Sequence, residues 1–260
     1  MRKRTGIRHG VRNAFFTMWG DNGGECPYAS ALGALMYAAA LAEEMPADEM
    51  KAKFKEITGE NYDDFLALDL PNYIHGTEKG VGTANYSKNH LYDDPFLGIM
   101  TLNAENADGS IYPAYAEKLH KIADASTTVY KKLFASMATL CDVLTIKFSL
   151  AERTRALYTN GDKEGLRAIA ENDYTECIKR LEIFYKTYRE QWYNMNKTYG
   201  FEVQDARLGG LMRRLQSCKE RLLSYVNGEI DVIEELSEEV LPILDGNYPI
   251  WALTLTANIM

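Results

Sequence analysis

Residues 119–148, LHKIADASTTVYKKLFASMATLCDVLTIKF, and residues 166–192, LRAIAENDYTECIKRLEIFYKTYREQW, carry the clearest structural signal in this chain of 260 residues. Apolar residues recur in both stretches at spacings of three and four, which is the period of a helix with one buried face. The turn sequence Asn160-Gly-Asp162 lies between them. We therefore predict two long antiparallel helices and a mainly α, bundle-like fold.

Shorter helices are predicted on both sides of this pair. Pro27 suits the first turn of one helix, Gly59 and Gly228 suit the ends of two others, and Pro71 and Pro242 each follow a helical pattern. The expected ranges are 28–44, 47–58, 61–70, 205–226 and 232–240.

Three further stretches do not have a helical pattern. Residues 69–112 are rich in Gly, Asn, Asp and Pro, so we predict a long irregular connection with a short turn near 88–92. Residues 13–19 have the length and aromatic content of a buried strand that Gly20 to Gly24 then break, and residues 250–256 suit a short terminal strand. Because one strand cannot form a sheet, strand 13–19 needs a partner near the C-terminus or on other polypeptide.

The composition excludes several kinds of function. Net charge is -8 and the acidic residues are dispersed, so we expect no nucleic-acid partner, which would need clustered Lys and Arg. The longest apolar stretch, residues 29–42, is shorter than the roughly 20 residues that cross a bilayer, so we predict no membrane span. Four widely spaced cysteines without a C-x-x-C pair are typical of reduced, buried thiols in a cytoplasmic protein: Cys26, Cys141, Cys177 and Cys218.

One pair of residues has metal-ligand spacing. Glu117 and His120 lie on one face of a predicted helix, as in the di-iron sites of helical bundles. Such sites need a second pair of this kind, which the four histidines of the chain do not supply. We predict no metal site and interpret His120 as a partly exposed helix residue. No cofactor and no nucleophilic catalysis are expected, because phosphate-loop spacing and a G-x-S-x-G motif are absent from the sequence.

Two polar segments each allow two interpretations. Residues 196–210 read as a helix end at Gly200, with Asp205 as N-cap or first-turn residue, Arg207 paired to a neighbouring acid and Phe201 in the core, or alternatively as a ligand contact. Residues 91–95, Leu-Tyr-Asp-Asp-Pro, start a turn or line a cleft.

Trp19 and Asp21 are the candidate binding residues. They follow a predicted strand, and residues just past the carboxyl end of a barrel strand line the active site of such barrels. An indole packs on the apolar face of a sugar ring, and a carboxylate accepts hydrogen bonds from two hydroxyls. The alternative is a core Trp and a helix-capping Asp.

The sequence resembles glycoside hydrolase family 20 β-N-acetylhexosaminidases in three places. Ala14-Phe-Phe-Thr-Met-Trp-Gly-Asp-Asn-Gly-Gly-Glu-Cys26 is similar to their last barrel strand and loop. Residues 91–98 and 196–211 are similar to segments of one branch, in which a helical domain follows the barrel. The resemblance implies that residues 1–45 are the last β/α unit of a (β/α)8 barrel and that residues 46–260 form the helical domain.

The resemblance also implies a substrate and a mechanism. In the family the 2-acetamido group of the sugar attacks the anomeric carbon, a Glu protonates the leaving oxygen, and a neighbouring Asp orients the acetamido group. That Asp-Glu pair lies on an earlier barrel strand, so no catalytic residue is assigned to this chain. Trp19 is implied as a wall of the sugar pocket, and Asp21 as an acceptor for the outer hydroxyls of an N-acetylhexosamine-containing glycan.

We therefore expect a fragment that does not catalyse by itself. Its expected partners are the missing barrel portion or, through the apolar surface of residues 13–45, a second copy of the chain. The alternative from a different class is a stand-alone helical interaction module in which residues around Trp19 belong to the core.

Overall fold

The computed structural model of the chain describes residues 10, 13, 15–18, 25–74, 86–98 and 108–240. These residues are almost entirely helical and include no strand, which confirms the mainly α class. The strand predicted for residues 250–256 lies outside the described residues.

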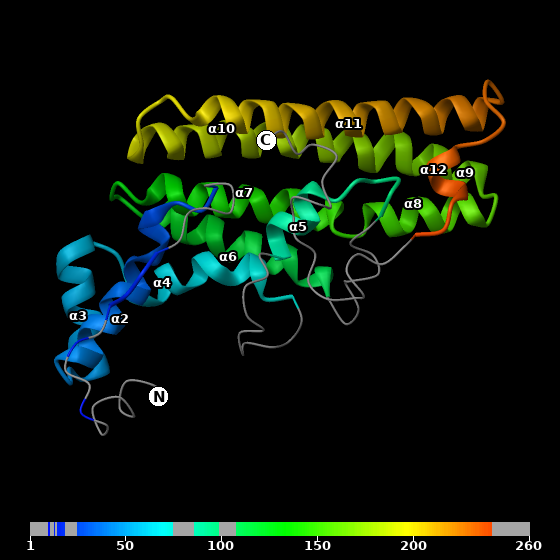
Figure 1. Cartoon of the computed structure of the whole chain (residues 1–260). Coiled ribbons are helices and arrows are strands. Elements are labelled where there is room, and N and C mark those ends of the chain that lie inside the picture. Colours follow the sequence, from blue (N-terminus) through cyan, green and yellow to red (C-terminus); the bar gives the residue numbers. More distant parts are fainter. Residues whose placement is uncertain are drawn as a thin grey trace.

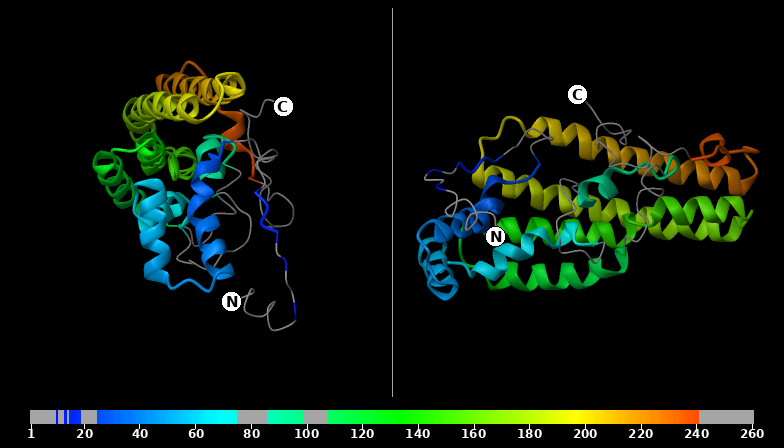
Figure 2. Two further views of the ribbon diagram at one scale, coloured as in Figure 1. Left: turned by 90° about the vertical axis from the view of Figure 1, so that its left-hand side faces the viewer. Right: turned by 60° about the horizontal axis from the view of Figure 1, so that its bottom comes forward.

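Four long helices form the body of the molecule (Figure 1). They pack side by side in the order α6 (Tyr112–Ala125), α7 (Lys131–Lys147), α10 (Thr175–Met195) and α11 (Phe201–Asn227). The α10–α11 pair, drawn in yellow and orange, stays adjacent in the turned views (Figure 2). Each helix turns an apolar face inward, and a fully buried Leu is worth roughly 1.5–3 kcal/mol. The leucines at the centre of this core are Leu119, Leu144, Leu181 and Leu215, all at 0% exposure.

The first predicted long helix is divided, whereas the second is continuous. Residues 119–148 fall into α6, a connection and α7, because the hydroxyls of Ser126 and Thr128 both donate hydrogen bonds to the Glu60 carboxylate, and such side-chain bonds compete with helix continuation. Residues 166–192 run without interruption through α9 (Lys163–Ala168), a π-helical turn η5 (Ile169–Tyr174) and α10. The predicted turn at 160–162 is confirmed, and it joins α8 (Leu150–Thr159) to α9.

A second core holds the N-terminal helices against the bundle. In it Phe54 packs edge-to-face on Tyr62 and Phe65, and Phe65 packs in the same way on Phe134 of α7. The elements of this region are η1 (Tyr28–Ala31), α2 (Leu32–Ala42), α3 (Ala47–Thr58), α4 (Tyr62–Leu66) and η2 (Ala67–Asn72). As predicted, α3 ends at Gly59, which has the positive φ of 77° that glycine adopts without strain.

The connection predicted to be irregular contains a buried helix. Helix α5 (Tyr86–Tyr92) is buried from Ser87 to Tyr92, and the short turn η4 (Gly109–Ile111) precedes α6. Lys147 of α7, itself 1% exposed, donates hydrogen bonds to the backbone oxygens of His90 (3.3 Å) and Asp93 (2.5 Å). A cation at the C-terminal end of a helix satisfies carbonyl groups that have no partner within the helix. Helix α5 is therefore a core element, although four of its seven residues are Ser, Lys, Asn or His.

The N-terminal segment differs from the prediction in two respects: the strand predicted for residues 13–19 is not formed within the described residues, and one cysteine is not buried. Phe15, Phe16 and Met18 lie in no strand, and they are 95%, 58% and 50% exposed instead of buried. The described part of the chain supplies no neighbouring strand that could cover them. Cys26 is exposed, and only the other three cysteines are buried thiols as predicted.

One helical stretch is long enough and apolar enough to cross a membrane, judged by length and composition alone. It covers Lys131–Thr159, which is α7 and α8, and 61% of its most apolar window is buried inside the molecule. The core helices of a soluble protein pass the same test.

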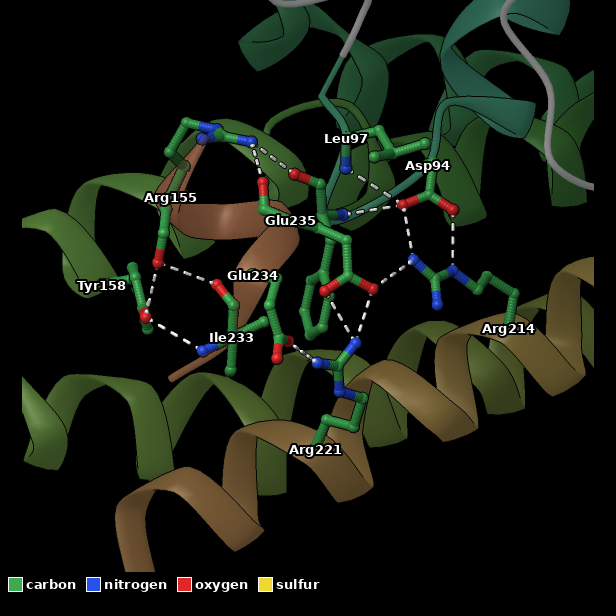
Figure 3. A network of polar contacts seen from close by, with 11 residues as sticks. Asp94, Leu97, Arg155, Tyr158, Arg214, Arg221, Ile233, Glu234 and Glu235 are labelled. Atoms are coloured by element: carbon green, nitrogen blue, oxygen red, sulfur yellow. Dashed lines mark hydrogen bonds and ion pairs between the residues drawn. The ribbon is translucent and has the colours of Figure 1, made fainter. Parts of the chain in front are cut away.

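A network of charged groups joins α5 to the end of the described chain (Figure 3). The Asp94 carboxylate, 0% exposed, accepts two hydrogen bonds from Arg214 of α11, at 2.7 and 3.1 Å, and two from the backbone N–H groups of Phe96 and Leu97. Burial alone lowers the pKa of Arg214, but the hydrogen bonds and charge of Asp94 outweigh that effect and raise it. Asp94 is thus a fully bonded, structural carboxylate.

Arg155 of α8 fastens the last helix, α12 (Glu234–Ser237), to this network. Its guanidinium donates to the backbone oxygens of Phe96 at 2.6 Å and Glu235 at 2.9 Å, and also to two further carbonyls of the α12 region. Arg221 pairs with Glu234 and Glu235 from the other side (Figure 3). Helix α12 is therefore shorter than the predicted 232–240, because backbone oxygens at its end bind Arg155.

We predict that Asp94→Ala lowers the free energy of unfolding by about 3 kcal/mol, because it leaves Arg214 and two backbone donors without their acceptor. Urea denaturation followed by circular dichroism measures this loss. The matched control is Glu182→Ala, whose ion pair with Lys186 is largely exposed and which should leave the midpoint almost unchanged. Equal effects of the two substitutions would contradict this account of the network.

Candidate functional site

A buried cluster of charges lies where the N-terminal segment meets the helical bundle. The Glu25 carboxylate pairs with Lys88 of α5 through Oε2 and with Arg207 of α11 through Oε1, the latter at 2.9 Å. The side chains of Glu25, Lys88 and Arg207 are only 17%, 5% and 9% exposed. Tyr188 of α10 adds a hydrogen bond from its hydroxyl to the backbone oxygen of Glu25 at 3.2 Å.

This cluster brings two of the three family-like segments of the sequence together with the helix that precedes the third. Glu25 belongs to residues 14–26, Arg207 belongs to residues 196–211, and Lys88 lies on α5, whose last two residues begin segment 91–98. The pairs join residues 63 and 182 positions apart in the chain. Two of the three segments therefore meet at one carboxylate, and the helix that leads into the third supplies Lys88 to it.

Burial and the charge of Glu25 shift the pKa values of groups in and around the cluster. Burial lowers the pKa of the Lys88 ammonium, while the charge of Glu25 and the hydrogen bond to it work in the opposite direction and Arg207 lowers it further. Burial raises the pKa of the Tyr92 and Tyr188 hydroxyls, and the charge of Glu25 raises both further. Each oxygen of the Glu25 carboxylate holds one cation, so this geometry suits the fastening of chain segments better than proton transfer.

The two residues predicted to bind a sugar are close to this cluster in the sequence. Trp19 and Asp21 both lie outside the described residues, so their sugar-binding role stays a prediction. Asp21 precedes Glu25 by four residues, which span at most about 14 Å when fully extended. Because Lys88 and Arg207 hold Glu25 on the bundle, this length of chain limits how far Asp21 can lie from it.

Segment 196–210 contains the predicted helix boundary and the predicted core residue, with three differences from the prediction. Helix α10 ends at Met195, Gly200 has a φ of 96° and caps α11, and Phe201 is a buried plug with 1% exposure. Arg207 does pair with an acid, but the acid is Glu25 and not a sequence neighbour. Asp205 is not the N-cap, because α11 begins four residues earlier; it accepts a hydrogen bond from the Tyr185 hydroxyl at 2.8 Å.

A cavity of about 300 Å³ lies beside the Glu25 cluster. Its floor consists of buried apolar side chains contributed by α5, α7, α10 and α11, and exposed residues of α2 and α4 lie at its rim. Both interpretations of segment 91–95 are met in part, since a turn follows Asp94 at residues 95–97 and Leu91 lines the cavity. The floor and rim residues used below are Leu91, Leu133, Phe184, Leu208, Ala34 and Leu66.

The suspected metal ligands bind other partners. Glu117 pairs with Lys121, and His120 Nε2 lies 2.8 Å from the Asp142 carboxylate, with 45% of the imidazole side chain exposed as predicted. Within the described ranges, no group of three or more His, Cys, Asp or Glu side chains could hold a metal ion.

We predict that Glu25→Ala loosens the N-terminal helices without unfolding the bundle, because Lys88 and Arg207 lose a buried carboxylate. Hydrogen exchange followed by mass spectrometry should show amides of α2 exchanging roughly tenfold faster or more, with α10 and α11 unchanged. Glu56→Ala, an exposed glutamate of α3, is the control and should leave the exchange of α2 unaltered. Unchanged exchange of α2 in Glu25→Ala would show that the cluster does not hold the segment.

Comparison with known protein families identifies the helical part. Residues 63–249 match the family described as Glycoside Hydrolase 20C C-terminal domain, and the match includes Lys88, Asp94, Arg207 and Arg214. It starts after the segment that contains Trp19 and Asp21. No curated protein matches the chain. Because the match covers well over half of its residues, the chain belongs to the Glycoside Hydrolase 20C C-terminal domain family.

Proposed function

We propose that this chain is the helical C-terminal part of a β-N-acetylhexosaminidase, and that residues 1–45 are the last β/α unit of its catalytic barrel, in which residues 13–19 form a strand once a neighbouring barrel strand pairs with them. The observation that carries the proposal is the burial of Glu25 between Lys88 and Arg207. These ion pairs tie the segment that resembles a barrel end to the domain that the family comparison identifies. A stand-alone interaction module is less well supported, because the matched domain is one found in glycoside hydrolases.

Exposed apolar residues of the N-terminal segment support a further contact. Phe15, Phe16 and Tyr28 are 95%, 58% and 62% exposed. Apolar groups in such numbers on one segment are typical of a surface that another polypeptide covers. The proposed partner is the remaining barrel portion or, in its absence, a second copy of this chain, and light scattering distinguishes a dimer from a monomer.

The proposed substrate is a glycan that ends in an N-acetylhexosamine. Trp19 supplies a stacking wall for the sugar ring, and Asp21 accepts hydrogen bonds from its outer hydroxyls. The acetamido oxygen of the sugar then attacks the anomeric carbon while a carboxylic acid protonates the leaving oxygen. The Asp-Glu dipeptide at Asp48 and Glu49 does not suit that acid role, since both residues are exposed in the first turn of α3.

The test compares the chain alone with the same chain fused behind a barrel segment from another member of the family. We expect no release of 4-nitrophenol from 4-nitrophenyl N-acetyl-β-D-glucosaminide by the chain alone and measurable turnover by the fusion. In the fusion, Trp19→Ala should lower kcat/KM by about tenfold to hundredfold, because the stacking surface is lost.

Glu49→Gln is the matched control and should leave kcat/KM of the fusion unchanged. Turnover by the purified chain alone would contradict the claim that it does not catalyse by itself. Full activity of the Trp19→Ala fusion would contradict the assignment of Trp19 to the sugar pocket.

A further inference from the structure

The cavity beside Glu25 has a shape that suits a small ligand. Its volume is about 300 Å³, roughly twice that of an engineered protein cavity that binds benzene and close to the lower limit of natural ligand sites. Leu133 and Leu208 on its floor are 0% and 1% exposed, whereas Leu66 at its rim is 49% exposed. The cavity is therefore a pocket that opens to the surface.

The polar groups at the edge of the pocket are engaged with one another. Asn72 Oδ1 accepts hydrogen bonds from the backbone N–H of Ser87 at 3.1 Å and from its hydroxyl at 2.9 Å, and Lys88 binds Glu25. The Ser30 hydroxyl donates to the backbone oxygen of Pro27. A charged ligand would lose its hydration here and would have to compete with existing bonds. An uncharged apolar group gains from burial against the leucine floor.

We propose that this pocket binds an aryl or short alkyl group of roughly a dozen non-hydrogen atoms. The assignment of that group to a substrate rests on the proposed function: it is the apolar group linked through the leaving oxygen of an N-acetylhexosaminide. Cys26 and Ser30 line the pocket, and Cys26 follows Asp21 by five residues, so the two are at most about 17 Å apart. The length of chain between Asp21 and Cys26 thus sets an upper limit on the distance between a sugar bound at Asp21 and the pocket.

Titration calorimetry of the full chain tests the proposal with three probes: 4-nitrophenol, 4-nitrophenyl N-acetyl-β-D-glucosaminide and methyl N-acetyl-β-D-glucosaminide. We expect both nitrophenyl probes to bind with a Kd of about 0.1–1 mM, and the methyl glycoside to bind at least tenfold more weakly. Ligand-observed NMR provides a second readout at such affinities.

A substitution at the rim separates this pocket from non-specific binding. Ala34 is an exposed residue of α2 that lines the pocket, so Ala34→Trp should obstruct the opening and weaken binding of both nitrophenyl probes at least tenfold. Ala39 is an exposed residue of the same helix that does not line the pocket, and Ala39→Trp should bind like the unaltered chain. Circular dichroism verifies that both variants are folded.

Three outcomes would overturn the proposal. Failure of both nitrophenyl probes to bind would exclude the pocket as an apolar site, and equal binding by Ala34→Trp would place the site elsewhere. Binding of 4-nitrophenol but not of its glycoside would exclude the link to a sugar substrate. None of these results depends on hydrolysis, so a failure here is distinguishable from a failure of the proposed function.

Discussion

The pairing of Glu25 with Lys88 and Arg207 is the constraint on which the arrangement of this molecule depends. Removing a charged group from water costs several kcal/mol unless partners replace the lost hydration. All three side chains are largely buried, so removing any one of them leaves a neighbouring buried charge with one ion pair fewer. The ion pairs therefore fix the N-terminal segment, helix α5 and helix α11 relative to one another, and all three contribute residues to the pocket beside Glu25.

Further polar contacts connect helix α5 to the rest of the molecule. Lys147 binds backbone oxygens at the end of α5, and Asp94, just beyond it, binds Arg214 of α11. Arg155 and Arg221 then hold α12. Polar contacts thus follow one path from the N-terminal segment to α12, beside a core made mainly of apolar side chains. Directional hydrogen bonds specify which segments meet, whereas apolar packing alone would tolerate several arrangements.

The helical body was largely predictable, because periodicity reports which face of a helix is buried. Gly59 and Gly228 marked their helix ends correctly, since glycine adopts a positive φ without strain. Periodicity did not reveal the break at Ser126, which depends on hydrogen bonds to Glu60, 66 residues away. It also missed buried α5 and the role of Glu25, because their partners are distant in the chain. Trp19 and Asp21 remain predictions from a motif.

A double-mutant cycle between Glu25 and Arg207 tests the central claim most directly. The free energy of unfolding is measured by urea denaturation for the unaltered chain, Glu25→Gln, Arg207→Met and the double variant. If the buried pair holds the N-terminal segment to the bundle, the coupling energy is about 1–3 kcal/mol. Additive effects, with a coupling energy below about 0.5 kcal/mol, would contradict the account.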